Sequence, residues 1–313
     1  MGTFGTIILL IIAFFLISGA ITNFIAAAAK SAVPKIGRTT AVRGGRIHWV
    51  ESGQGRPIVM IHGLGANLRN FTCALTDRLD GEFRVIALDR AGCGWSERDG
   101  EAQATLPEQA RMIAEFIEKE GLENPLIVGH SLGGAVALTL GLNHREVVGG
   151  LALLCPATQP IEGTPEVFKG LDISSAGLRK FIAHTVSGPL GLLMEKKIFS
   201  VVFAPEPILP DFWVKGGGKL GRSPGAFISA SEDLVQSRAS VEEVAGREGE
   251  LTMPVGVLYA EADEILDPKL HGEKFAELSG ADLKLLPNRG HMIPLTAPDD
   301  CADFIREMAA KSA

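Results

Sequence analysis

The chain opens with an uninterrupted apolar stretch. Residues 6–29 contain no charged side chain and no proline. As a helix rising ~1.5 Å per residue, this stretch is long enough to cross a hydrocarbon core of ~30 Å. We therefore predict a membrane anchor, or a signal, in residues 1–33. An anchor is favoured, because cleaved secretory signals usually begin with Lys or Arg and carry a shorter apolar region.

Positive side chains follow this stretch at Lys30, Lys35, Arg38, Arg43 and Arg46. Membrane proteins tend to keep such charges on the cytoplasmic side, so the pattern favours a cytoplasmic catalytic domain on a single amino-terminal helix. The alternative is a periplasmic or secreted protein, because an apolar segment at the amino end also serves as an export signal.

Beyond residue 34 the apolar pattern alternates between two periods. A Gly-Gly turn at residues 44–45 predicts a β-hairpin, and short apolar runs then alternate with helical spacing. This alternation is typical of βαβ units, so the predicted fold class is α/β, with a mostly parallel sheet and helices on both faces. Strands are expected at 57–62, 84–89, 125–129, 147–154, 253–260 and 283–287, and helices at 67–79, 106–120, 268–278 and 298–310.

The alternation stops between residues 157 and 249. This segment carries aromatic and leucine side chains among prolines and glycines, and we predict that it forms a helical cap inserted into the core. The core is then formed by residues 34–156 and 250–313. The bulky apolar residues noted in the cap are Phe168, Phe181, Leu190, Leu192, Leu193, Phe199, Phe203, Phe212 and Trp213.

Composition narrows the possible partners. The 313 residues carry a formal net charge of −7, and no Lys/Arg cluster is interleaved with aromatic residues, so a nucleic-acid partner is not expected. The four cysteines form no C-x-x-C pair and predict neither a metal site nor a required disulfide. Cys73 and Cys155 have apolar neighbours and are expected to be buried thiols. No oligomeric state is predicted.

Candidate chemistry begins at Ser131, between a predicted strand and a predicted helix. Gly129 and Gly133 flank it two positions away and provide the space that so tight a turn needs. The turn would present the hydroxyl above the sheet and direct the amide of Leu132 at the group under attack. The alternative is a glycine-rich turn with an incidental serine.

A serine nucleophile needs a base, and seven histidines compete for that role. We choose His291, which follows Gly290 in a loop after the last strand. His130 shares the strained turn and is expected to point away, and His62 is expected to pack or hydrogen-bond in its glycine loop. His48, His144, His184 and His271 lie in no motif.

Four carboxylates follow the penultimate strand, at Glu261, Asp263, Glu264 and Asp267. Asp263 is the best placed to orient the base, because Glu261 lies too close to the strand end and Asp267 is expected to cap the next helix. The proposed triad therefore has the chain order Ser131, Asp263, His291.

Five motifs together resemble the α/β-hydrolase superfamily: HGLG at 62–65, DRAGCGWS at 89–96, GHSLGG at 129–134, AEAD at 260–263 and GH at 290–291. The resemblance covers about residue 39 to the carboxyl end. It implies that the amide of Leu64 joins that of Leu132 in an oxyanion hole, and that residues 89–96 form a structural turn in which Arg90 is structural. The inserted segment resembles the variable lids that carry specificity in this family.

The resemblance implies a serine hydrolase without a cofactor. Epoxide hydrolases and haloalkane dehalogenases use a carboxylate where Ser131 stands, so we expect ester hydrolysis of the esterase or lipase type, on a small apolar or lipid-like ester. The alternatives are a polyester depolymerase, a thioesterase, a C–C hydrolase, a cofactor-free haloperoxidase, or a non-catalytic ligand-binding or scaffold protein.

Overall fold

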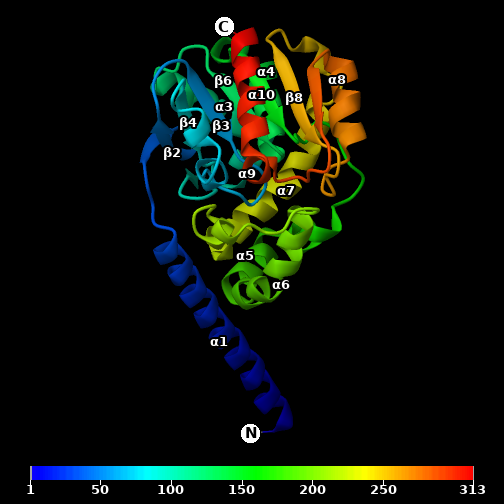
Figure 1. Cartoon of the computed structure of the whole chain (residues 1–313). Coiled ribbons are helices and arrows are strands. Elements are labelled where there is room, and N and C mark those ends of the chain that lie inside the picture. The colour runs from blue at the N-terminus through cyan, green and yellow to red at the C-terminus, as the bar shows by residue number, and fades with distance from the viewer. Residues whose placement is uncertain (1, 313) are drawn as a thin grey trace.

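The computed structural model describes residues 2–312, and its body is built on one twisted sheet (Figure 1). Within the described residues the sheet has nine strands, and β5 (Glu97–Arg98) pairs only with β2 at one side. The other strands lie in the order β1 (Arg38–Val42), β2 (Gly45–Ser52), β4 (Arg84–Leu88), β3 (Pro57–Ile61), β6 (Leu126–His130), β7 (Gly150–Leu154), β8 (Val255–Ala260) and β9 (Asp282–Leu286).

The sheet is parallel from β4 to β9, and β1 and β2 form the predicted antiparallel hairpin at one edge. The central strands are continuous apolar runs because helices cover both faces of a parallel sheet. Figure 1 shows α10 (Pro298–Lys311) in front of the sheet and α4 (Leu132–Asn143) and α3 (Leu106–Lys119) behind it. The predicted α/β fold class is confirmed.

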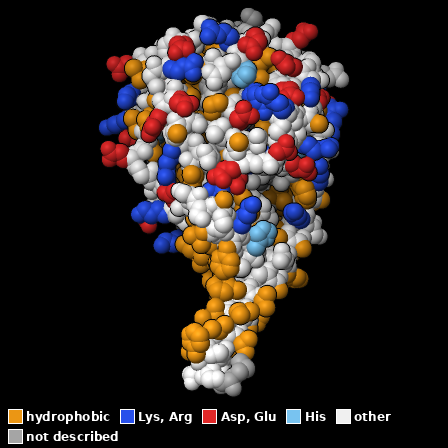
Figure 2. Space-filling model, turned by 180° about the vertical axis from the view of Figure 1, so that it is seen from behind, with side chains coloured by type: hydrophobic (Ala, Val, Ile, Leu, Met, Phe, Trp, Pro, Cys, Tyr) orange, Lys and Arg blue, Asp and Glu red, His pale blue; other side chains and the backbone are white. Residues whose placement is uncertain are grey.

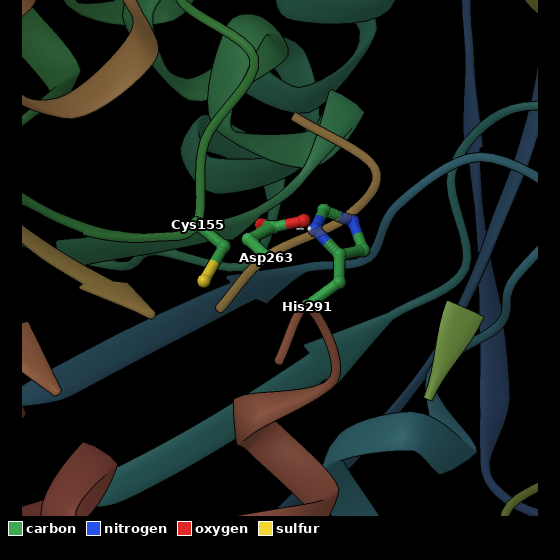
Figure 3. Close-up of side chains that lie close together, drawn as sticks. All are labelled: Cys155, Asp263 and His291. Atoms are coloured by element: carbon green, nitrogen blue, oxygen red, sulfur yellow. Dashed lines mark hydrogen bonds and ion pairs between the residues drawn. The ribbon is translucent and has the colours of Figure 1, made fainter. Parts of the chain in front are cut away.

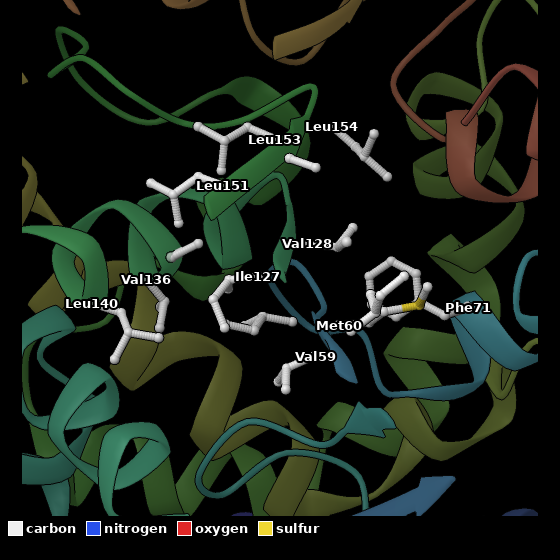
Figure 4. Close-up of a cluster of buried hydrophobic side chains, with 14 of the residues drawn as sticks. Val59, Met60, Phe71, Ile127, Val128, Val136, Leu140, Leu151, Leu153 and Leu154 are labelled. Carbon is white, nitrogen blue, oxygen red and sulfur yellow. The ribbon is translucent and has the colours of Figure 1, made fainter. Parts of the chain in front are cut away.

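The core lies where α4 crosses the middle strands (Figure 4). Side chains from β3, β6, β7 and α4 interdigitate there with no exposed surface, and burying each one contributes roughly 1.5–3 kcal/mol relative to leaving it in water. The fully buried residues drawn and labelled in the figure are Val59, Met60, Phe71, Ile127, Val128, Val136, Leu140, Leu151, Leu153 and Leu154.

Three predicted elements differ from the structure. The helix expected at 67–79 is instead α2 (Arg69–Thr72) and a 3-10 turn, η1 (Thr76–Arg78), because several hydrogen bonds between them span three residues rather than four. The strand expected from residue 147 starts at Gly150, after another 3-10 turn. The helix expected at 268–278 begins as a π-helical turn, η8 (Lys269–Glu273), before α8 (Lys274–Ser279).

The chain between β7 and β8 is helical, and the described residues there form no strand. This segment lies at one end of the body (Figure 1). Its treatment as a separate unit over 157–249 remains a prediction. Its elements are η4 (Glu166–Leu171), α5 (Ala176–Thr185), α6 (Ser187–Val202), η5 (Pro210–Trp213), η6 (Gly218–Arg222), α7 (Pro224–Val244) and η7 (Glu248–Glu250).

The predicted apolar segment forms α1 (Thr3–Ala32), which extends away from the body beside α5 and α6 (Figure 1). Within the described residues it is the one helix that is long and apolar enough to cross a membrane, and 18 consecutive residues of it have a mean hydropathy of 2.7. A signal sequence near the amino terminus passes the same test of length and composition, so this finding leaves both an anchor and a signal open.

A buried network of charges joins α7 to the core. Asp233 on α7 bridges Arg90 at 2.7 Å and Arg98 at 2.6 Å, and Glu232 bridges Arg98 at 2.7 Å. Burial alone would raise the pKa of the Asp233 carboxyl, but the two guanidinium groups outweigh it and hold that pKa below its usual value. The network also reaches α5, where Arg179 contacts Glu232 at 3.2 Å.

We predict that Asp233→Ala lowers the free energy of unfolding by about 3–5 kcal/mol, because it leaves Arg90 and Arg98 buried without their shared counter-charge. The matched control is Asp172→Ala, which removes a partner of Arg238 at the surface and should change stability by less than about 1 kcal/mol. Urea unfolding of the full chain in detergent micelles measures both. Equal midpoints for the two variants would contradict the prediction.

Candidate active site

Ser131 stands at the junction of β6 and α4 in a strained backbone conformation. Its φ of 54° and ψ of −124° lie in a region that L-amino acids rarely adopt. Its amide donates to the carbonyl of Leu154 on the neighbouring strand at 3.1 Å, and its carbonyl accepts from Gly134 at 2.8 Å and Ala157 at 3.0 Å. These bonds on three sides hold the strained residue in place.

The two flanking glycines are required by close backbone contacts. A Cβ on Gly133 would lie 2.1 Å from the carbonyl oxygen of Ile61 at the end of β3. A Cβ on Gly129 would lie 2.6 Å from the carbonyl oxygen of Gly133. The turn can therefore pack this tightly against β3 only without side chains at these positions, as the sequence pattern predicts.

The glycine loop after β3 lies directly over the serine. A Cβ on Gly63 would lie 2.9 Å from Cβ of Ser131 and 3.3 Å from its Oγ, so the next residue, Leu64, also adjoins the hydroxyl. The backbone amides of Leu64 and Leu132 donate to no protein acceptor among the described residues. Two such amides beside a serine hydroxyl, one of them at a helix amino terminus, suit the stabilisation of a developing oxyanion.

His291 and Asp263 form a buried pair (Figure 3). Nδ1 of His291 lies 2.7 Å from Oδ2 of Asp263, and Oδ1 of Asp263 accepts from the amides of Ile265 at 2.8 Å and Leu266 at 3.1 Å. Burial alone would raise the pKa of the Asp263 carboxyl, but His291 and these amides outweigh it and lower that pKa, so the carboxylate stays ionised. Nε2 of His291 is then left to exchange a proton.

His291 also adjoins the serine turn. Nε2 of His130, the residue before Ser131, donates to the carbonyl of His291 at 2.9 Å, and the two rings lie 5.0 Å apart. Among the described residues no hydrogen bond joins Oγ of Ser131 to His291. Such bonds are often long or poorly aligned before a substrate binds. The structure thus brings the three predicted triad residues to one edge of the sheet.

A family model described as the alpha/beta hydrolase fold matches residues 56–298. The chain belongs to the α/β-hydrolase family. The resemblance carried by the sequence motifs is therefore confirmed.

Relatives of this hydrolase carry several names. Haloalkane dehalogenase 2 of Mycobacterium tuberculosis is 29% identical over 275 residues, which cover 84% of this chain and 91% of that protein. Lipase 1 of Psychrobacter immobilis is 25% identical over 272 residues, covering 84% and 80%. The solved structure of a thermophilic esterase from Thermogutta terrifontis superposes with a TM-score of 0.65 at 22% identity, over 88% of this chain and 97% of that one.

Two other histidines near this edge, His62 and His130, already hydrogen-bond to backbone groups. Nε2 of His62 accepts from the amide of Arg90 at 2.9 Å, and its Nδ1 donates to the carbonyl of Gly63 at 2.9 Å. Burial lowers the pKa of His62 to about 4 and that of His130 to about 3, so both rings stay neutral near pH 7. Neither competes with His291 as the base.

The other candidate carboxylates are also placed as expected. Glu261 and Glu264 are exposed to solvent, and Asp267 accepts from the amide of Lys269 at 2.9 Å, at the start of η8. Asp263 is the buried member of the four.

Arg90 has a more direct part in the site than the sequence suggested. Its guanidinium donates to the carbonyls of His62 at 2.8 Å and Gly63 at 2.9 Å, and its ion pair with Asp233 fixes it to α7. Arg90 is therefore structural, as the sequence resemblance implies, but it positions the loop that carries Leu64. Asp233 was missed, because a single carboxylate on a cap helix gives no local signal.

Cys155 adjoins the triad without a sequence motif. Sγ of Cys155 lies within 4.8 Å of the ligand atoms of Asp263 and His291, and these residue types also suit a soft metal ion (Figure 3). Burial and the Asp263 charge raise the pKa of the Cys155 thiol well above its usual value, so the thiol stays protonated.

We predict that Gly133→Ala destabilises the hydrolase by about 1–3 kcal/mol, because its Cβ would overlap the backbone of β3. Gly141→Ala on the same helix is the matched control. Its Cβ would meet only side-chain atoms, at 3.1 Å and beyond, and alanine favours a helix by about 1 kcal/mol. Urea midpoints in detergent micelles compare the two variants. A Gly133→Ala protein as stable as Gly141→Ala would refute the contact argument.

We predict that the folded state loses stability as the pH falls from about 6.5 towards about 4. Burial lowers the pKa of His62 and His271 to about 4 and that of His130 to about 3. Below the ordinary histidine pKa of about 6.5, the unfolded chain binds protons that the folded one does not. This stability is therefore present above about pH 6.5 and declines as the pH falls, by up to about 1.4 kcal/mol per pH unit for each histidine.

The slope of unfolding free energy against pH measures this effect. His271→Gln should lower the slope by up to about one proton. The same slope in the unsubstituted protein and in His271→Gln would show that the burial of His271 does not govern its proton binding.

Proposed function

We propose that this α/β-hydrolase cleaves carboxylic esters through an acyl-enzyme on Ser131. The observation that carries the proposal is the buried Asp263–His291 pair, with a hydrogen bond of 2.7 Å, beside a serine held at a φ of 54°. An imidazole oriented by a carboxylate is the usual base for a serine nucleophile. Support also comes from the family, which includes proteins named as a lipase and as esterases.

The residues divide the reaction as follows. Oγ of Ser131 bonds to the ester carbonyl carbon while Nε2 of His291 takes the hydroxyl proton, and the oxyanion is held by the amides of Leu64 and Leu132. The alcohol leaves with the proton from His291. Water, deprotonated by the same imidazole, then attacks the acyl-enzyme; the bond from the acyl carbon to Oγ breaks, His291 returns the proton to Oγ of Ser131, and the acid is released.

Several relatives are named for other reactions. The residue at position 131 helps to choose between those reactions and ester hydrolysis. Haloalkane dehalogenases resemble the chain but use a carboxylate nucleophile, whereas this chain has a serine. The loop over Ser131 offers the amide of Leu64 and the start of α4 offers that of Leu132 where an acyl oxygen would develop charge, and these groups suit acyl transfer.

Only some of the apolar residues of the cap are free to support the proposal of an apolar acyl substrate. Four of its aromatic residues pack against one another, with Phe199 and Phe212 ring centroids 4.8 Å apart and Phe203 fully buried, and they join the hydrophobic core. Leu178, Phe181, Leu190 and Leu193 are exposed instead. We propose that α1 is a membrane anchor with the catalytic domain on the cytoplasmic side, and that the substrate is lipid-like.

We predict that the full chain hydrolyses p-nitrophenyl esters and that Ser131→Ala lowers kcat by about 10⁴-fold or more, because the nucleophile is lost. Asp263→Asn should lower kcat by about 10⁴-fold by disturbing the imidazole tautomer. Ser200→Ala, at an exposed cap position, is the matched control and should keep full activity. The dependence of the rate on acyl length describes the pocket.

A fluorophosphonate probe should label the unsubstituted protein and not Ser131→Ala. If the folded protein neither hydrolyses any ester nor takes up the probe, Ser131 is not an activated nucleophile, and a ligand-binding or scaffold role replaces this proposal.

A further inference from the structure

The two halves of α1 have different surroundings. Before Phe15, its large apolar side chains are exposed. From Phe15 onward, one side of the helix packs on the cap: the Phe15 and Phe181 rings are 5.0 Å apart, and the hydroxyls of Ser18 and Thr22 both donate to the carbonyl of Thr185 at 2.8 Å. The hydroxyls of Ser18 and Thr22 are thus satisfied by the cap rather than by water, as an apolar environment requires.

The contact between α1 and the cap is close. A Cβ on Gly188 would lie 2.8 Å from Cα of Thr22, and a Cβ on Gly19 would lie 3.1 Å from the carbonyl of His184. Small residues on both sides therefore let the backbones approach, which is typical of helices that pack within membranes. The position of α1 fixes the position of α5 and α6.

The length of α1 determines how deep the cap lies if α1 spans a bilayer. Residues 3–14, which precede the first aromatic contact with the cap, rise about 18 Å at ~1.5 Å per residue. A hydrocarbon core is ~30 Å thick. About 12 Å of the core must therefore surround the part of α1 that carries the cap. A tilted helix uses more residues to cross, so tilt increases this overlap.

The outer side of α1 is apolar at that same level. Leu16, Ile17, Ile21 and Phe24 face away from the protein, and Phe24, which follows the Thr22 contact, is 75% exposed. The first charged residue of α1 is Lys30, near its end. Lipid acyl chains can therefore cover exposed apolar side chains of α1 both before its contact with the cap and at the level of that contact.

The cap continues this apolar surface. Leu178 and Phe181 on α5, and Leu190, Leu193 and Met194 on α6, are exposed, and Leu193 is 82% exposed. Figure 2 shows hydrophobic side chains along α1 and onto the adjoining end of the body. A contiguous exposed patch of this kind marks a contact with a membrane or another protein.

The charges of α5 and α6 favour a lipid surface. Glu195 is the one acidic residue on these two described helices, and its carboxylate pairs with Arg222 at 2.8 Å. Lys180, Lys196 and Lys197 are exposed. Lysines beside an apolar face suit contact with lipid phosphates. An anionic membrane surface attracts each lysine by about 1 kcal/mol.

We propose that α5 and α6 insert their exposed apolar side chains into the near leaflet of the bilayer that α1 crosses, so that the cap is seated in the membrane. This inference rests on the proposed role of α1 as an anchor, and not on the chemistry of Ser131. Lipid acyl chains cover the exposed apolar side chains of α5 and α6 in this proposal.

The seat places the membrane surface beside a cavity at the end of α1. A cavity of about 510 Å³ lies between the end of α1 and the core, lined by Ala26 and Lys30 of α1 and by Gly65, the residue after Leu64. A lipid ester at the surface of the bilayer would therefore meet the protein beside the loop that carries Leu64.

Fluorescence quenching tests the seat in the full chain, reconstituted into phosphatidylcholine vesicles whose acyl chains are brominated. Leu193→Trp should lose fluorescence relative to vesicles of unbrominated lipid, after subtraction of the signal of the three native tryptophans. Ile12→Trp reports α1 and should be quenched as well. Leu278→Trp on α8, a leucine 47% exposed, is the matched control and should keep its fluorescence.

The outcomes separate the proposals. Quenching of Ile12→Trp without Leu193→Trp would leave the anchor standing and overturn the seat, and a dimer in detergent would then identify a second copy as the occupant. Quenching of neither would overturn both anchor and seat. Met194→Trp repeats the test at a second position. Ester hydrolysis in the same samples reports Ser131 separately, so loss of that activity does not affect the result on the seat.

Discussion

The left-handed backbone at Ser131 is the constraint on which the rest of the site depends. A residue held in such a region costs about 1–3 kcal/mol, which the surrounding structure must offset. Here the carbonyls and amides of β7, α4 and the segment after β7 bind the serine on three sides. The glycines at 129 and 133 let α4 approach β3 closely, so the serine emerges at the carboxyl edge of the parallel strands.

The other proposed catalytic groups reach the same edge because they follow strands that run in the same direction. Asp263 follows β8 and His291 follows β9, and parallel pairing from β4 to β9 places all of these strand ends together. Burial at this edge then affects which of the side chains are charged. His62 and His130 stay neutral because burial penalises their charge, whereas Asp263 stays ionised because hydrogen bonds outweigh the same penalty.

Charge pairs link the cap to this edge. Arg90 binds both the loop over Ser131 and Asp233 on α7, so it links the cap helix to the loop. On the opposite side of the cap, α5 binds α1 through Thr185. The cap therefore contacts the proposed membrane anchor on one side and the proposed oxyanion loop on the other. These contacts set where the site lies relative to the proposed anchor.

The sequence by itself determined the fold class, the apolar helix and the positions of Ser131, Asp263 and His291, because each is marked by a local pattern. Strand and helix periods, glycines two residues from a serine, and polar residues just after apolar strands are all readable from neighbours in the chain. The family membership followed from the same motifs.

Only the tertiary structure decided which residues support that site. Asp233 comes from a cap helix and Cys155 from a strand end, and no local pattern connects them with Ser131. The helix expected at 67–79 was broken by hydrogen bonds that periodicity does not reveal. The docking of α1 on α5 likewise depends on contacts between residues more than 160 positions apart, since Ser18 and Thr185 meet only through packing.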